Sequence, residues 1–230
     1  MLDNETKEQL KQYLALLESD IVFSASLDES DDSKKIEDFL TEVAEMDGKI
    51  SIEAKKLKRT PSFEINQKGS EASGIIFAGL PMGHEFTSFI LALLQVGGRA
   101  PKIEDSMIQQ IQSIDRALTF ETYVSLTCHN CPDVVQALNI MAVLNPKISH
   151  TMIEGGMYQA EIDEKEIMAV PTVFLNDEEF DSGRMTIEQI IEKVSGPLSA
   201  DEFVDKETFD VLVIGGGPAG ASSVSYTHLT

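Results

Sequence analysis

The chain has 230 residues, which at roughly 100–200 residues per domain suits one large domain or two modest ones. Hydrophobic residues make up 42% and charged residues 25%, enough apolar material for a core, so disorder throughout is excluded. The net charge of −21 would repel a phosphate backbone or an anionic membrane surface, so we expect neither nucleic acid nor a membrane as a partner. Because the chain shows no basic leader with an apolar stretch, and no apolar run near the ~20 residues that span a bilayer, we expect a cytoplasmic protein.

Apolar periodicity predicts alternating helices and strands in the first half of the chain. Helices are predicted over residues 5–17, 31–46 and 83–96, and strands over 21–25, 49–54, 62–66 and 74–80. The second half begins the same order again. Helices are predicted over residues 103–117, 131–144, 158–168 and 186–194, and strands over 119–126, 148–154, 172–175 and 179–182.

The two halves share one plan, in which helix–strand–helix–strand is followed by strand–strand–helix. A plan that occurs twice indicates an internal duplication of roughly 100 residues. Pro61 and Pro171 immediately precede a strand-like run in the corresponding place of each half. The first half has no counterpart of the helix at 158–168 and no cysteines. We therefore predict an α/β protein made of two fused repeats that are alike in plan but not in chemistry.

This plan divides the chain into four predicted parts. Residues 1–102 form the repeat without cysteines, and residues 103–195 form the repeat that carries them. Residues 196–208 are polar and acidic, which is typical of a solvated linker. Residues 209–230 are predicted to open a third domain.

The third domain begins with the sequence FDVLVIGGGPAG, a strongly apolar run followed by glycines. Gly215, Gly217 and Gly220 have the G-x-G-x-x-G spacing that lets a pyrophosphate approach the start of a helix. A dinucleotide-binding unit needs about 30 residues for its βαβ fold, whereas only ten residues follow Gly220. We therefore interpret this segment as the truncated first strand of a Rossmann-type domain.

The two cysteines of the chain, Cys128 and Cys131, enclose the motif C-H-N-C between a predicted strand and a predicted helix. The helix dipole and free N–H groups at such a junction stabilise a thiolate, lowering a cysteine pKa from about 8.5 to about 3.5–7.5. Cys128 would then attack a disulfide, and Cys131 would resolve the mixed disulfide that forms. The i, i+3 spacing places both sulfurs on one face of the first turn, close enough to bridge.

Two other interpretations of the cysteine pair stay open. Tetrahedral zinc needs four ligands, so a zinc site would require His129 and His150 to complete the set. Alternatively, the two thiols are inert buried side chains, although a strand-to-helix junction is an unusual place for them.

Two polar residues are candidates for a supporting role. Glu85, one step after His84 at the start of a predicted helix, would tune thiol protonation if the repeats pack together. The alternative for Glu85 is a favourable interaction with the helix dipole. His129 would either stabilise the Cys128 thiolate or serve as an exposed spacer.

A C-x-x-C motif followed about forty residues later by Val170-Pro171 resembles the thioredoxin superfamily, whose cis-proline lies against the disulfide. The whole chain resembles the N-terminal part of a more specific family, the flavoprotein component of alkyl hydroperoxide reductase. The stretches that carry this resemblance are GLPMGHEFTSFILALLQVGG, CHNCPDVVQALN, NPKISHTMIEGG, AVPTVFLN, GRMT and GGGPAG.

The resemblance implies a relay of electrons. In that family a flavin domain takes electrons from NADH and passes them through its own C-x-x-C to the N-terminal dithiol, which reduces a peroxiredoxin partner. The full-length family protein is implied to be a homodimer. Cys128 would be the attacking thiol and Cys131 the resolving thiol, with Pro171 beside them.

The same resemblance bears on the cofactors. Gly215, Gly217 and Gly220 would begin an incomplete FAD site, so we expect this chain alone to bind neither FAD nor NADH. The alternative from another class is a non-catalytic, thioredoxin-like platform that docks a partner.

Overall fold

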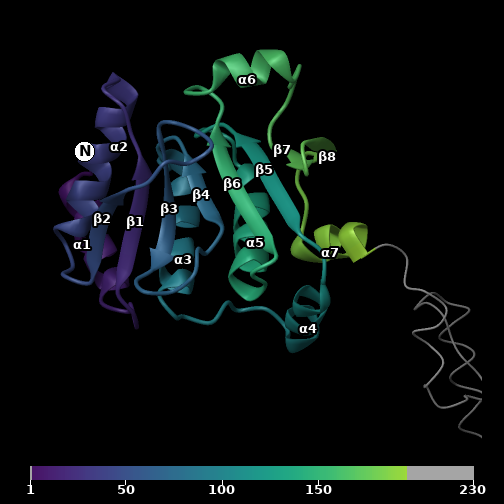
Figure 1. Ribbon diagram of the computed structural model, residues 1–230, viewed down its shortest axis with the longest axis horizontal. Helices are drawn as coiled ribbons and strands as arrows, with labels where there is room; N and C mark the ends of the chain where they lie inside the picture. Colours follow the sequence, from purple (N-terminus) through teal and green to yellow (C-terminus); the bar gives the residue numbers. More distant parts are fainter. Residues whose placement is uncertain (1, 196–230) are drawn as a thin grey trace, which may run out of the picture. The chain divides into compact units, whose positions relative to one another are not determined.

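The computed structural model describes residues 2–195 (Figure 1), which are organised around one eight-stranded sheet with the order β2-β1-β3-β4-β6-β5-β7-β8. The predicted linker at 196–208 and the segment 209–230 with its three glycines lie outside the described residues. Within 2–195, no helix is both long and apolar enough to cross a bilayer.

The strand pairings show the same unit twice. The strands are β1 (Ile21–Ser26), β2 (Ile50–Ala54), β3 (Ser62–Gln67), β4 (Ile75–Ala78), β5 (Leu118–Val124), β6 (Ile148–Glu154), β7 (Thr172–Leu175) and β8 (Glu178–Ser182). In the first repeat β1 pairs in parallel with β2 and antiparallel with β3, which pairs with β4. In the second repeat β5, β6, β7 and β8 pair in the same way. A parallel pairing of β4 with β6 joins the two units into one sheet, which confirms the predicted pair of fused thioredoxin-like repeats.

The helices follow the predicted order, with differences at their ends. They are α1 (Asn4–Leu14), α2 (Asp31–Ala44), the 3-10 turn η1 (Gly83–Glu85), α3 (Phe86–Val96), α4 (Asp105–Ser113), α5 (Cys131–Leu144), α6 (Gln159–Glu164) and α7 (Ile187–Ser195). The helix predicted over 103–117 ends early because Ile114 has an extended backbone. The one predicted over 158–168 is shorter because Glu166 has a positive φ of 53°, which no helix continues.

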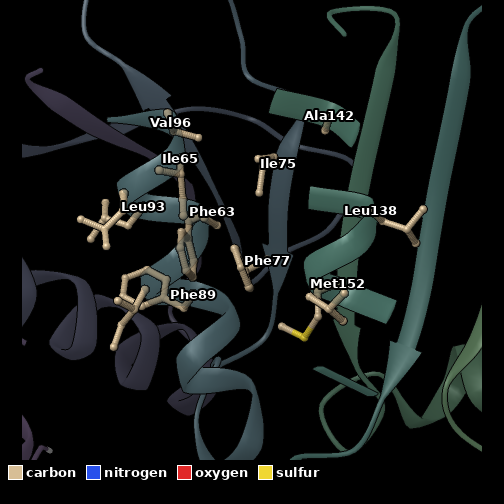
Figure 2. Close-up of a cluster of buried hydrophobic side chains, with 14 of the residues drawn as sticks. Phe63, Ile65, Ile75, Phe77, Phe89, Leu93, Val96, Leu138, Ala142 and Met152 are labelled. Atoms are coloured by element: carbon tan, nitrogen blue, oxygen red, sulfur yellow. The ribbon is translucent and has the colours of Figure 1, made fainter. Parts of the chain in front are cut away.

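The main core lies on one face of the sheet, where α2, α3 and α5 pack. Phe89 of α3 is at its centre, with its ring centroid 5.1 Å from that of Phe39 on α2 and 6.0 Å from those of Phe63 and Phe77 on the sheet. Figure 2 shows this cluster continuing into the second repeat through Leu138 of α5 and residues around it. Since α3 and α5 also pack against each other, the two repeats share one core.

The opposite face of the sheet is covered by α6 and by the loop between β2 and β3. Tyr158 and Ile162 pack on a small apolar group that includes Tyr123 of β5. Arg59, from the β2–β3 loop, is 8% exposed and forms an ion pair with Glu121 of β5. This face therefore also ties the first repeat to the second.

Candidate functional site

The two cysteines form a disulfide at the junction between β5 and α5. The Cys128 and Cys131 sulfurs are 2.19 Å apart and their Cα atoms 5.6 Å apart. Asn130, rather than Cys128, is the residue before the helix, yet Cys128 Sγ accepts a hydrogen bond from the Cys131 N–H at 3.2 Å. Cys131 is 0% exposed and Cys128 is half-buried. Cys128 is therefore the more accessible sulfur, and it faces the positive end of the helix.

A second loop meets the disulfide from the other end of the repeat. The Val170–Pro171 peptide bond is cis, and the Val170 carbonyl oxygen lies 3.7 Å from Cys128 Sγ. The Thr172 hydroxyl donates a hydrogen bond to the Ala169 carbonyl at 2.7 Å, which holds this loop in shape. The structure thus brings together Cys128, Cys131 and the Pro171 loop.

The first repeat has a different group in the equivalent place. Asp28 lies three residues before α2, as Cys128 lies three residues before α5. The Asp28 carboxylate accepts hydrogen bonds from the Ser30 hydroxyl at 2.5 Å and the Ser33 hydroxyl at 2.6 Å. These hydrogen bonds lower the pKa of Asp28 to about 2. This repeat therefore presents an ionised carboxylate where the other has a thiol, although its Thr60–Pro61 bond is also cis.

The first repeat nevertheless reaches the dithiol through η1. The His84 N–H donates to the Leu126 carbonyl, in the loop that carries Cys128, at 3.1 Å. Gly83 has a φ of +59°, and a side chain there would press into the Leu126 carbonyl oxygen, so glycine permits the close approach. The His84 and His129 ring centroids are 4.1 Å apart. Periodicity gave no sign of this contact, and the only sequence signal for it is the glycine before His84.

Glu85 lies at the boundary between the repeats. Its side chain is 0% exposed, it caps no backbone N–H of α3, and neither carboxylate oxygen has a hydrogen-bond partner among residues 2–195. Burial raises the pKa of Glu85 to about 7, and the Ser88 hydroxyl offsets this in part. Ser88 itself accepts a hydrogen bond from Gln136 of α5 at 3.3 Å. The structure therefore places an uncompensated carboxyl group where the start of α3 packs against α5.

His150 does not join the cysteines. It is 0% exposed on β6, with its ring nitrogens 2.9 Å from the Thr122 hydroxyl and 2.7 Å from the Asn139 amide oxygen. Burial lowers the pKa of His150 to about 3, so the ring is neutral in the fold. The four-ligand zinc set of Cys128, Cys131, His129 and His150 is therefore not assembled in this structure, and no group of three or more metal-ligating side chains occurs within 2–195.

Comparisons with known proteins agree with this geometry. Residues 118–195 match the family model of the thioredoxin domain. Over 99% of its length the chain is 57% identical to a Bacillus subtilis (strain 168) protein named NADH dehydrogenase. Over the same share it is 52% identical to the alkyl hydroperoxide reductase protein AhpF of Staphylococcus aureus (strain NCTC 8325). The chain spans 44% of the length of each of these two relatives.

Solved structures show the same fold. The NTD_N/C domain of alkylhydroperoxide reductase AhpF from Enterococcus faecalis (V583) matches with a TM-score of 0.78 at 31% identity, covering 84% of this chain and 99% of that domain. A protein disulfide oxidoreductase from Aeropyrum pernix K1 matches with a TM-score of 0.74 at 17% identity, over 84% of this chain and 93% of that one, which shows a shared fold. The resemblance predicted from the sequence is confirmed: the chain belongs to the AhpF family, the flavoprotein component of alkyl hydroperoxide reductase, and corresponds to its N-terminal, thioredoxin-like part.

Proposed function

We propose that this chain is a thiol–disulfide oxidoreductase module that carries electrons from an NADH-dependent flavin domain to the disulfide of a peroxiredoxin. The observation that carries the proposal is the Cys128–Cys131 disulfide at the start of α5, beside the cis Val170–Pro171 loop. The names of the relatives support the peroxide-reducing setting. FAD and NADH enter only as the source of electrons, because Gly215, Gly217 and Gly220 lie outside the described residues.

The proposed cycle uses two thiol–disulfide exchanges. An external dithiol first reduces the Cys128–Cys131 disulfide, delivering two electrons and two protons. The Cys128 thiolate then attacks the partner's disulfide, forms a mixed disulfide and expels one partner thiolate. Next, the Cys131 thiolate attacks Cys128 Sγ, which expels the second partner thiolate and restores the Cys128–Cys131 bond. The partner leaves as a dithiol, whose two electrons suffice to reduce a hydroperoxide to an alcohol and water.

The second exchange needs a proton acceptor inside the protein. Cys131 is 0% exposed, so its thiol cannot pass a proton directly to bulk water. Glu85 is equally buried, lacks a hydrogen-bond partner among residues 2–195, and has a pKa raised to about 7 by burial. A carboxyl group with a pKa near the working pH is well matched to general acid–base transfer. We therefore assign Glu85 the role of accepting the Cys131 proton and returning it on reduction.

Glu85→Gln should stabilise the fold at high pH and slow the exchange. Since folding raises the pKa of Glu85 from 4.5 to about 7, the ionisation penalty is absent below about pH 4.5 and complete above about pH 7. At 1.36 kcal/mol per pKa unit, the stability difference between variant and parent should shift by about 3 kcal/mol in the variant's favour from pH 5 to pH 8. Denaturant unfolding at both pH values measures this shift, and stopped-flow thiol exchange measures the slowing. A difference that does not change with pH would contradict a buried, ionising Glu85.

Transfer to a partner disulfide tests the function itself. The reduced chain is mixed with an oxidised two-cysteine peroxiredoxin, quenched with acid, alkylated and weighed by mass spectrometry. We expect Cys128 and Cys131 to become disulfide-bonded as the partner becomes reduced, with a reduction potential of roughly −180 to −270 mV, the range of known carriers. Binding without transfer would refute the relay and support the docking platform instead.

A further inference from the structure

The thiol-free repeat places an imidazole against the motif that encloses the disulfide. His84 and His129 come from different repeats, both are exposed, and their ring centroids are 4.1 Å apart. The backbone on the His84 side is fixed, because the His84 N–H bonds the Leu126 carbonyl at 3.1 Å and Gly83 allows the two segments to touch. This contact therefore belongs to a defined interface between η1 and the dithiol loop.

The His129 ring has no other anchor in the described part of the chain. Within residues 2–195, neither imidazole forms a hydrogen bond or an ion pair through its side chain. The nearest charged group on α5, Asp133, is already paired with Arg184 at 2.5 Å. Glu85 is buried rather than directed to the exposed rim. An exposed side chain without anchors samples several rotamers, so the His84 ring is what limits His129.

We propose that His84 is a positioning residue of the redox site: by stacking on His129, it keeps an imidazole beside Cys128. An imidazole next to a cysteine stabilises the thiolate, and this favours the reduced state of the pair. The first repeat would then contribute to the chemistry of the second through His84 at the surface, as well as through Glu85 in the interior. This inference rests on the proposed function, but it concerns a property of the dithiol that is measurable without any partner.

Removing His84 should make the dithiol less acidic and more reducing. In His84→Ala we expect Cys128 to alkylate about three- to tenfold more slowly at pH 6.5, with the profile of rate against pH displaced upward. A tenfold change in the dithiol–disulfide equilibrium corresponds to about 30 mV, so the reduction potential should become more negative by up to that amount. Iodoacetamide kinetics and equilibration with glutathione measure the two quantities on the full 230-residue chain.

Four further variants separate positioning from other roles. His129→Ala and the double variant should match His84→Ala, because residues that act as one unit give non-additive effects. His84→Phe keeps a ring against His129 and should stay close to the parent. Thr87→Ala alters an exposed residue of α3 close to His84 and should change nothing.

The results decide the proposal in either direction. An unchanged potential and alkylation profile in His84→Ala, additive effects of the two histidine changes, or a His84→Phe variant as impaired as His84→Ala would each overturn it. Failure of transfer to a peroxiredoxin would leave these measurements intact, so the two proposals fail separately.

Discussion

Cys128→Ser should abolish electron transfer to the partner, whereas Cys131→Ser should stop the reaction halfway. Serine provides no thiolate at neutral pH, so without Cys128 no attack on the partner's disulfide takes place. With Cys131 replaced, Cys128 still attacks, but the mixed disulfide that forms has no resolving thiol. The covalent complex should therefore accumulate to one partner per chain, visible by mass spectrometry and lost on adding dithiothreitol.

A matched control comes from the other repeat. Asp28 occupies the place before α2 that Cys128 occupies before α5, and Asp28→Ser should leave transfer unchanged. Full peroxide-reducing activity of Cys128→Ser in a reconstituted system would overturn the relay. Trapping by Cys128→Ser through Cys131 would reverse the assigned order of attack, which rests on Cys131 being 0% exposed.

Local sequence signals were sufficient for the elements that form the site. The bounds of α5 agree with the helix predicted at 131–144, because an apolar stripe follows Pro132 at the first turn. The strand at 148–154 agrees as well, and the repeated order of elements foreshadowed the shared pairing pattern. These features depend on neighbours within a few residues, which is the range over which periodicity is informative.

Contacts between the repeats were beyond the reach of that reasoning. The sequence suggested Glu85 only on the condition that the repeats pack together, and it said nothing about His84 meeting His129. The bonds of Arg59 to Glu121 and Glu161 span 62 and 102 residues. No helical or strand period relates such positions, because tertiary packing alone decides which of many charged residues meet. The linker and the glycines of the tail lie outside the described residues, and the four-part domain division stays a prediction.

The Arg59 cluster connects the first repeat to both segments that hold the disulfide. Arg59 binds Glu121 through two nitrogens at 2.8 and 3.0 Å, and Glu161 at 2.7 Å. Glu121 lies on β5, which leads into the Cys128 loop, and Glu161 lies on α6, which leads toward Pro171. Burial alone would raise the pKa of Glu121, but bonds from Arg59 and Lys58 overcome it and bring this pKa to about 2.

Arg59→Met should therefore destabilise the protein by about 3–5 kcal/mol at pH 7, because it leaves buried carboxylate charge without its main partner. For a domain of this size, about 2–4 °C per kcal/mol gives a fall in Tm of about 10 °C. Lys58→Met is the matched control: Lys58 binds the same Glu121 oxygen at 2.8 Å, but its side chain is 62% exposed. Exposed ion pairs contribute about 0–1 kcal/mol, so this variant should lose no more than that.

The pH dependence gives the cluster an independent test. A carboxylate whose folded pKa lies below its unfolded value stabilises the fold above the unfolded pKa, and that contribution is lost as pH falls through the folded pKa. For Glu121 the window runs from about 4.5 down to about 2. In Arg59→Met the stranded carboxylate can take up a proton at higher pH, so the stability gap to the parent should be widest at pH 7 and narrow below about pH 4.5. Urea unfolding of both variants across this range measures it. Equal losses for Arg59→Met and Lys58→Met, or a gap that stays constant with pH, would show that the buried charges are not what Arg59 stabilises.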